Sequence, residues 1–353
     1  MTPAAEARRL RPAIPALLDW YAAHRRPLPF REDPTPYRVW VSEIMLQQTR
    51  IETVLPYFER FMRAFPDVTS LADADEGHLF KLWEGLGYYS RARNLHKAAK
   101  QTVERFGGTL PASYDDLLSL QGIGEYTAGA IASIAFGLPV PAVDGNVLRV
   151  FARLTACDGD VLSPAVRKAL RAVVEAVLPA ETPGAFNEAV MELGETVCLP
   201  GAAVRCGDCP LADVCNARKR GCAETLPVRK APKPRRAETR TVAVLMTTEP
   251  TPRVLLHRRG DGLLARMWEL PNEEGALTPE QVAAAWSLTP IEAETLPQGK
   301  HVFSHVEWHL HGVRLTVEPF PAPETYVWVT AEELTRDFAL PRAFSLYSEY
   351  VTR

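Results

Sequence analysis

Two carboxylates stand out in this sequence because their neighbours would change their chemistry. Glu43 lies within WVSEIMLQQT, with apolar residues on both sides. A carboxyl group in apolar surroundings has a raised pKa and can stay protonated near neutral pH, as a general acid requires. The commoner alternative is a glutamate on the exposed side of an amphipathic helix.

Asp144 directly precedes a predicted helix in the segment PAVDGNVLRVFARL. An aspartate in this position is most simply the N-cap of the helix. The backbone donors of an N-cap would also hold an ionised carboxylate in place. A protonated acid together with a carboxylate anion is the pair that cleaves glycosidic bonds in sugar hydrolases.

Four of the six cysteines crowd into one short stretch, at Cys198, Cys206, Cys209 and Cys215. Thiolates at this density select zinc or an iron–sulfur cluster, and the spacing alone leaves both open. Either metal would fix a loop that is too small to fold by itself. Cys157 and Cys222 fall outside the pattern, and we interpret them as ordinary thiols.

A glycine pair, Gly122 and Gly124, flanks one apolar residue in LQGIGEYTAGAIAS, between two helical stretches. Such a turn can present backbone N–H groups to a phosphate at the start of the next helix. The plainer interpretation is a helix–helix turn, and a single pair of this kind supports no more than that.

The elements that must position these groups fall into two regions. From Ile14 to about Cys215, apolar residues recur at helical spacing between Gly and Pro clusters, which predicts an all-helical domain over residues 1–225. A Pro-rich and basic segment, 226–239, is typical of an extended linker. Residues 240–353 contain β-branched and aromatic runs, which predict a second domain of α+β structure.

Charge divides along the same boundary. The chain carries a net charge of −3, but residues 1–236 hold 30 Lys and Arg against 27 Asp and Glu, and residues 237–353 hold 10 against 16. This balance permits contact between the first region and DNA without establishing it. The N-terminus predicts an amphipathic helix rather than a signal peptide, and apolar runs are too short for a membrane span. We therefore expect a cytoplasmic monomer, associated with the nucleoid if the source is bacterial.

The order of these motifs resembles that in MutY-type adenine DNA glycosylases. WVSEIMLQQT, the glycine hairpin, PAVDGNVLRV and the cysteine loop follow one another as they do in this branch of the helix-hairpin-helix glycosylases. The resemblance covers nearly the whole chain and implies a mainly α helix-hairpin-helix glycosylase domain plus an α+β Nudix-like domain. It also implies a [4Fe–4S] cluster on the four clustered cysteines.

The sequence departs from the family pattern at two places. Seven residues separate Cys198 from Cys206, where the family usually has six, and Phe30 replaces a frequent Trp. We expect the cysteine loop to accommodate the extra residue, and we expect Phe30 to keep the packing role of the aromatic ring.

The resemblance also implies roles for individual residues. Glu43 would protonate the adenine base and Asp144 would stabilise the cationic sugar, with Asn146 supporting Asp144. Tyr126 stands where lyase members of the superfamily have a catalytic lysine, so no amine is available to form a Schiff base and cut the strand. The predicted enzyme is therefore a monofunctional glycosylase.

Two further groups of residues are implied by the resemblance alone. The predicted adenine pocket contains Arg26, Leu28, Arg31, Leu46 and Glu188. The residues predicted to contact DNA and 8-oxoguanine are Gln48, Thr49, Tyr88, Gly122, Gly124, Phe303, Ser304 and His305. The expected partner is double-stranded DNA that contains adenine opposite 8-oxoguanine or guanine, and the target base must leave the stack to be cut.

Three rival functions remain at this point. An endonuclease III-like lyase is disfavoured by Tyr126 and by the second domain. A non-catalytic damage-binding protein predicts loss of a carboxylate, yet Glu43 and Asp144 are both present. A Nudix hydrolase needs a helix of clustered acids for magnesium, whereas TPEQVAAAWSL offers only Glu280.

Overall fold

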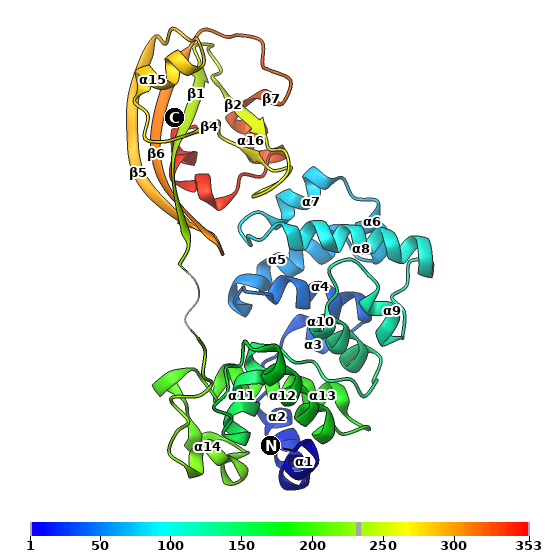
Figure 1. Cartoon of the computed structure of the whole chain (residues 1–353). Helices are drawn as coiled ribbons and strands as arrows, with labels where there is room; N and C mark the ends of the chain where they lie inside the picture. Colours follow the sequence, from blue (N-terminus) through cyan, green and yellow to red (C-terminus); the bar gives the residue numbers. More distant parts are fainter. Residues whose placement is uncertain (1, 231–233, 352–353) are drawn as a thin grey trace. The chain divides into compact units, whose positions relative to one another are not determined.

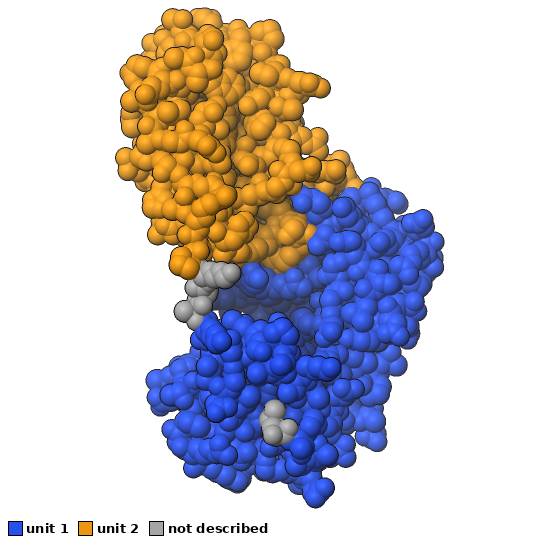
Figure 2. Space-filling model, in the orientation of Figure 1, with its two compact units in different colours: residues 1–73, 93–231 blue, residues 74–92, 232–353 orange. Residues whose placement is uncertain are grey.

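The computed structural model describes residues 2–230 and 234–351 and divides into two compact units. Unit 1 comprises residues 1–73 and 93–231, and unit 2 comprises residues 74–92 and 232–353 (Figure 2). Residues 231–233 of the predicted linker lie outside the described residues. Within the described residues, no helix is long and apolar enough to cross a membrane.

Among the described residues of unit 1, the regular elements are all helices (Figure 1). Its first half contains α1 (Pro3–Leu10), η1 (Arg11–Ala13), α2 (Ile14–His24), α3 (Pro29–Glu32), α4 (Pro36–Leu46), α5 (Ile51–Ala64) and α6 (Val68–Ala72). Its second half begins with α8 (Ser90–Phe106), whose first residues belong to unit 2, and continues with α9 (Tyr114–Leu118), α10 (Glu125–Ala130), the π-helix η2 (Ile131–Ala135), α11 (Gly145–Thr155), α12 (Pro164–Val177), α13 (Pro183–Thr196), the 3₁₀ turns η3 (Gly201–Ala203), η4 (Cys206–Asp208) and η5 (Ala212–Val214), and α14 (Asn216–Lys219).

Local signals in the sequence set where several of these helices begin. The Thr35 side chain accepts a hydrogen bond from Arg38 N at the start of α4, where Pro36 occupies the first turn. Asp67 and Ser70 form a capping box at the start of α6. These caps satisfy N–H groups that have no partner inside the helix, so they fix the first residue of each helix.

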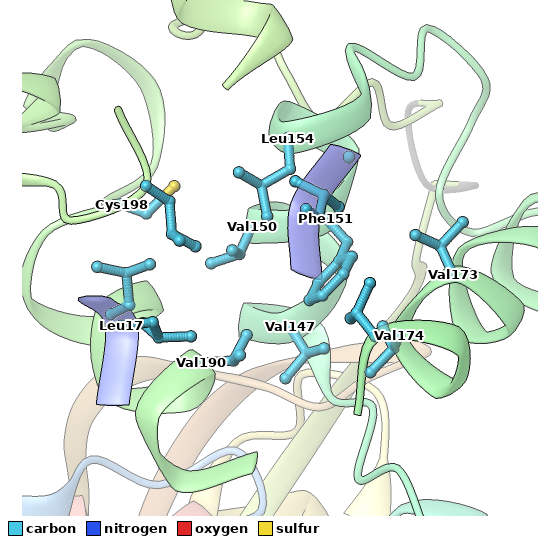
Figure 3. Packing of buried hydrophobic residues seen from close by; sticks show 14 of the residues in the cluster. Leu17, Val147, Val150, Phe151, Leu154, Val173, Val174, Val190 and Cys198 are labelled. Atoms are coloured by element: carbon cyan, nitrogen blue, oxygen red, sulfur yellow. The ribbon is translucent and has the colours of Figure 1, made fainter. Parts of the chain in front are cut away.

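One core of unit 1 lies among α1, α2, α11, α12 and α13 (Figure 3). The α11 residues Val147, Val150, Phe151 and Leu154 recur at helical spacing and are buried there. They pack on Leu17 of α2 and on neighbouring apolar residues of α12 and α13. This packing holds the start of α11, and with it Asp144, against α13.

Unit 2 contains a seven-stranded sheet. Its elements are α7 (Glu76–Trp83), β1 (Arg236–Thr247), β2 (Arg253–Arg258), β3 (Trp268–Glu269), β4 (Asn272–Glu274), α15 (Pro279–Ala285), β5 (Glu292–Val302), β6 (Val306–Val317), β7 (Tyr326–Thr330), α16 (Ala331–Asp337) and η6 (Arg342–Tyr350). The main strand order is β3-β2-β1-β6-β5, with β4 paired to β1 and β7 paired to β2. Strands β1 and β6 run parallel in the register Arg236↔Val306 to Thr247↔Val317, and the other pairs are antiparallel.

Alternation along β1 supplies both faces of this sheet with apolar side chains. Val242, Val244 and Met246 belong to the cluster that packs under η6 and α16. Ala243 and Leu245 belong to the opposite cluster, which is covered by α15. Successive side chains of a strand point to opposite faces, so this continuous apolar run predicts burial on both sides. The predicted fold class, a helical domain followed by an α+β domain, is confirmed.

Candidate active site

Glu43 lies in the last two turns of α4 with its side chain buried. The residue is 7% exposed, and Val41 and Met45 on either side of it are fully buried. Burial raises the pKa of Glu43 to about 7, an effect opposed by the Tyr126 hydrogen bond and reinforced by the charges of Asp144 and Glu188. The alternative of an exposed glutamate is therefore wrong, and the raised pKa that its neighbours predicted is confirmed.

Tyr126 comes from α10, which follows the glycine hairpin, and its hydroxyl reaches the Glu43 carboxyl group. The same hydroxyl lies 3.4 Å from Met191 Sδ on α13. Burial, followed by the nearby charges of Glu43 and Asp144, raises the pKa of Tyr126 well above its usual value. Tyr126 is therefore a neutral phenol near neutral pH.

Asp144 is the N-cap of α11, as its position predicted. Its two carboxyl oxygens accept from Val147 N at 2.7 Å and from Asn146 Nδ2 at 2.9 Å. Burial raises the pKa of Asp144 above its ordinary value, and these hydrogen bonds oppose the rise. The N-cap therefore holds the Asp144 carboxyl group in a fixed position in the lining of a cavity.

A buried amide on α13 holds the segment that leads to Asp144. Asn187 is 1% exposed, and its Oδ1 accepts from Ala142 N at 3.1 Å. Its Nδ2 donates to Val140 O at 2.9 Å and to Ser133 Oγ at 2.8 Å. The amide therefore makes three of its four possible hydrogen bonds. Through them, Asn187 of α13 connects η2 with the segment that leads to α11.

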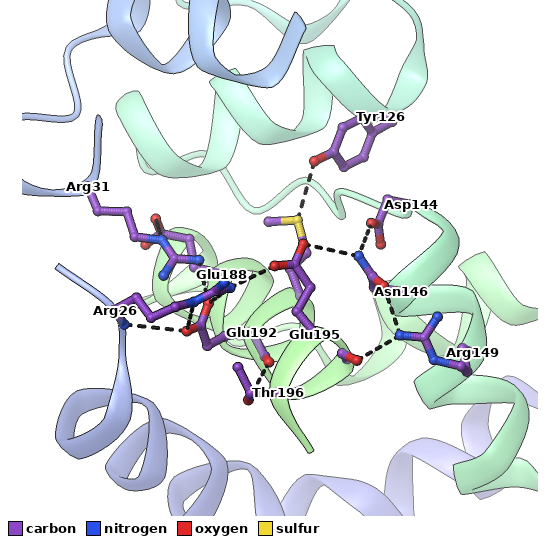
Figure 4. A network of polar contacts seen from close by, with 12 residues as sticks. Arg26, Arg31, Tyr126, Asp144, Asn146, Arg149, Glu188, Glu192, Glu195 and Thr196 are labelled. Carbon is purple, nitrogen blue, oxygen red and sulfur yellow. Dashed lines mark hydrogen bonds and ion pairs between the residues drawn. The ribbon is translucent and has the colours of Figure 1, made fainter. Parts of the chain in front are cut away.

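An ion-pair network lies beside the carboxylates (Figure 4). The Glu192 side chain is fully buried and accepts from Arg26 Nε at 2.6 Å and Arg26 Nη2 at 2.7 Å, and it pairs with Arg31 Nη2 at 2.9 Å. Burial alone would raise the pKa of Glu192, but these two guanidinium groups hold it below its usual value. Arg26 also pairs with Glu195 at 2.7 Å.

Glu43, Tyr126 and Asp144 line one cavity of about 490 Å³, a size typical of small-molecule sites. The predicted residues that line it are Arg31, Glu43, Leu46, Gln48, Tyr126, Asp144, Asn146 and Glu188. Phe30 also lines it, with its ring packed edge-on against Phe58, so an aromatic group remains where the family often has Trp. Glu43 and Asp144, which are distant in sequence, therefore face the same space.

Several predicted residues lie outside this lining, among them Arg26, Leu28 and Thr49. Arg26 stands behind the cavity in the ion-pair network, and Leu28 is 4% exposed at the N-cap of α3. Thr49 follows Gln48, whose positive φ of 59° reverses the chain after α4. These placements neither test nor exclude the roles that the resemblance implies.

Sequence reasoning missed Met191 and Glu195, which also line the cavity. Both lie on α13 at three and seven positions after Glu188, and residues at this spacing share one face of a helix. Helical spacing from Glu188 was therefore the signal that could have found them.

The glycine hairpin is a tight turn in which Gly122 has a φ of +77°. A side chain at Gly122 would bring its Cβ within 2.6 Å of the Asn94 side chain, which is a second reason for glycine. One backbone donor of the turn, Gln121 N, is bonded to Gln101 Oε1 at 2.8 Å.

Unit 2 carries the remaining predicted contact residues. Tyr88 is 50% exposed and has a positive φ of 49°, so it is not a packing residue. The loop 303–305 joins β5 to β6 and leaves Ser304 and His305 exposed. Phe303 anchors the loop, since its ring packs edge-on against Trp308 and its carbonyl accepts from Arg235 Nε at 3.0 Å.

The four clustered cysteines line one small apolar cavity between α11 and the loop that follows α13. None of the six cysteines forms a disulfide bond. The buried guanidinium of Arg153 lies 3.2 Å from Cys198 Sγ and also donates to Leu199 O. Within residues 2–230 and 234–351, no three His, Cys, Asp or Glu side chains are arranged as metal ligands.

Comparisons with known proteins agree with this architecture. Residues 41–176 match the HhH-GPD superfamily of base excision DNA repair proteins, and residues 241–349 match the NUDIX domain. The solved structure of a thermostable thymine-DNA glycosylase is similar, with a TM-score of 0.55 and 23% identity, over 60% of this chain and 98% of that one. The fold and site define a helix-hairpin-helix DNA glycosylase joined to a Nudix domain.

The relatives narrow the class further. The adenine DNA glycosylase of Mus musculus is 35% identical over 95% of this chain and 77% of its own length, and that of Homo sapiens is 34% identical over 94% and 73%. The chain belongs to the adenine DNA glycosylase family.

Proposed function

We propose that this enzyme removes adenine from duplex DNA where adenine stands opposite 8-oxoguanine or guanine. The observation that carries the proposal is the pair of carboxyl groups, Glu43 and Asp144, that line one cavity in different surroundings. A base inside a duplex cannot reach such a cavity, so the adenosine must be extruded from the stack.

The two carboxyl groups have complementary tasks in breaking the N-glycosidic bond. Glu43, protonated up to about neutral pH, donates its proton to the departing adenine. Asp144, held by Val147 N and Asn146, presents negative charge to the sugar as that sugar becomes cationic. Water then completes the hydrolysis and leaves an abasic site.

The polar wall beside Glu43 is suited to hold the purine. Arg31 lines the cavity and is fixed by Glu192, and its buried Nη1 has no hydrogen-bond partner among the residues that the structure describes. Glu188 lies 3.5 Å from Arg31 Nε in the same wall. A guanidinium donor next to a carboxyl acceptor matches the acceptor and donor groups on the edge of adenine.

Tyr126 supports hydrolysis without strand cleavage. Its phenol bonds to Glu43 at the position from which a lysine would attack the sugar. A neutral phenol forms no Schiff base, so we propose that the product keeps an intact strand with an abasic site.

Recognition of the opposite base is assigned to the loop 303–305. The exposed Ser304 hydroxyl can hydrogen-bond the modified base, and Phe303 keeps the loop rigid through its contacts with Trp308 and Arg235. A Nudix hydrolase activity has little support, because α15 carries only the exposed Glu280, which is engaged by Thr278.

We propose a [4Fe–4S] cluster on Cys198, Cys206, Cys209 and Cys215. The donor set fits the group, since four soft thiol ligands line one apolar cavity and Arg153 offers a compensating positive charge. When bound, the cluster would fix the loop between α13 and α14, which has only short 3₁₀ turns of its own.

The test is excision from end-labelled duplexes that place adenine opposite 8-oxoguanine, guanine or thymine. We expect alkali-dependent strand breaks with the first two duplexes and little product with the third. Asp144→Asn, which preserves the cap geometry, should reduce excision by at least about a hundredfold because it removes the anion. Strand breaks without alkali would favour a lyase, and tight binding without excision would favour a damage sensor.

A further inference from the structure

The Tyr126 hydroxyl touches two acceptors but has only one proton to give. Within the described part of the chain, it contacts the Glu43 carboxyl group on α4 and Met191 Sδ on α13. Figure 4 shows the contact between Tyr126 and the thioether sulfur, which measures 3.4 Å. A phenol donates one hydrogen bond and can accept others, so it cannot serve both acceptors at the same time.

The direction of these bonds must change with the protonation of Glu43. An ionised Glu43 is acceptor-only, and the Tyr126 proton then points to the carboxylate. A protonated Glu43 can donate to the Tyr126 oxygen instead. The phenolic proton is then displaced from Glu43 and needs another acceptor, because a buried donor left unpaired is costly.

We propose that Met191 is a positioning residue for the general acid: its thioether receives the Tyr126 proton whenever Glu43 carries its own. This inference rests on the proposed role of Glu43 as the acid. No covalent bond forms on Met191. After the Glu43 proton passes to adenine, the Tyr126 hydroxyl turns from sulfur back to the new carboxylate.

The position of Met191 is suited to this task. It is 9% exposed, lines the cavity, and lies three residues after Glu188 on the same face of α13. A thioether is a weak acceptor with no charge, so it accepts the phenolic proton without holding it against the stronger pull of a carboxylate.

Other groups that face Glu43 are charged or ionisable and are fixed in place. They are Asp144 at the start of α11, Glu188 on α13 and Arg31 on α3, while Glu195 on α13 faces Tyr126. A Met191→Leu variant keeps all of them and nearly the same side-chain volume, so it removes the acceptor with little other change.

The experiment measures single-turnover excision of adenine between about pH 5 and pH 9 in four proteins: wild type, Met191→Leu, Tyr126→Phe and the double variant. Without the sulfur acceptor, the protonated form of Glu43 is less favoured. In the pH–rate profile of Met191→Leu, we expect the alkaline limb to lie about half a pH unit lower than in wild type. Excision near pH 8 should then be about threefold slower. Rates on the acidic side of the optimum should stay within about twofold.

The double variant is the matched control. Tyr126→Phe removes the hydroxyl that links Met191 to Glu43, so adding Met191→Leu to it should not move the limb further. A parallel slowing at all pH values, or an equal shift in the Phe background, would show that Met191 acts by packing alone and would overturn the proposal.

A second measurement separates this proposal from the proposed function. Infrared titration of the Glu43 carboxyl band, identified by its loss in Glu43→Gln, reports the pKa without any turnover. A lower pKa in Met191→Leu supports the sulfur acceptor, and an unchanged pKa overturns it. Absence of excision by the wild type would instead refute the proposed function.

Discussion

At the scale of single residues, the proposed chemistry depends on burial, which raises the pKa of two ordinary carboxyl groups, and on the hydrogen bonds that oppose this rise. Burial raises the pKa of Glu43 to about 7, close to the pH at which a general acid is most useful. Burial also raises the pKa of Asp144, but Val147 N and Asn146 favour its ionised form. The site therefore needs a pH at which one group is protonated and the other is not.

Excision should consequently follow a bell-shaped pH profile. Activity falls as the pH rises through about 7, because Glu43 loses the proton that it must donate. Activity also falls toward acid as Asp144 becomes protonated, at a pH above its ordinary value of 3.8. Single-turnover rates measured across the pH range test this. A rate that keeps rising to about pH 9 would rule out Glu43 as the acid.

The same burial means that Glu43 lowers the stability of the folded protein when the pH is above the ordinary pKa of a glutamate. Because the pKa of Glu43 is raised in the folded state, its contribution to the free energy of unfolding is fully present below pH 4.5. That contribution is lost as the pH rises through about 7. Glu43→Gln lacks this loss, so its advantage over wild type should grow by about 2–3 kcal/mol between pH 5 and pH 8. Thermal unfolding at both pH values measures it, and an equal difference at both would contradict the raised pKa.

At the scale of elements, α13 organises the site. Its residues hold the arginine pair through Glu192, the segment before Asp144 through Asn187, and the Tyr126 hydroxyl through Met191. These contacts reach α3, α10 and the approach to α11. A rigid helix that contacts side chains from several other helices keeps the two carboxyl groups at a fixed position relative to each other.

Asn187→Ala should therefore impair both stability and chemistry. It leaves Ala142 N, Val140 O and Ser133 Oγ without their partner, which should lower the free energy of unfolding by about 2–4 kcal/mol. The Asp144 carboxylate is then less well held, so kcat should fall more than KM changes. Denaturant unfolding and steady-state kinetics check the two effects. Thr196→Ala, a loss of an α13 hydroxyl that bonds only within its helix, is the control.

At the scale of the whole molecule, the residues proposed for chemistry and those proposed for recognition belong to different units. The carboxyl groups and the ion-pair network lie in unit 1, and the loop 303–305 lies in unit 2. Residues 237–353 carry six more acidic than basic charges, so general attraction to the phosphate backbone is not their contribution. A local contact between this loop and a base is more consistent with the net negative charge of these residues than general attraction to phosphates is.

Ser304→Ala should reduce the preference for 8-oxoguanine over guanine without reducing the rate of adenine excision. A lost hydrogen bond to the modified base should lower discrimination between 8-oxoguanine and guanine by about threefold to tenfold. The single-turnover rate on adenine opposite guanine should remain close to that of wild type. Competition between the two duplexes in one reaction measures the ratio. Equal losses on both duplexes would place Ser304 in general DNA binding instead.

The sequence by itself determined the elements and the chemical groups. Helical spacing and N-caps such as Thr35 and Asp144 are local signals, and alternation along β1 is another, so the fold class, helical and then α+β, followed from the residues. The apolar neighbours of Glu43 predicted its raised pKa. The resemblance of the motifs to a known family supplied the roles of Tyr126 and Asn146.

Only the tertiary structure decided which distant groups meet. Tyr126 bonds to Glu43 across 83 positions in the sequence, and Arg26 pairs with Glu192 across 166. Met191 meets the Tyr126 hydroxyl only because the fold brings α13 beside α10, a contact that no local pattern predicts. Local patterns specify each helix and its buried face, but the partner of a side chain depends on how the helices pack, and that is set by the whole core.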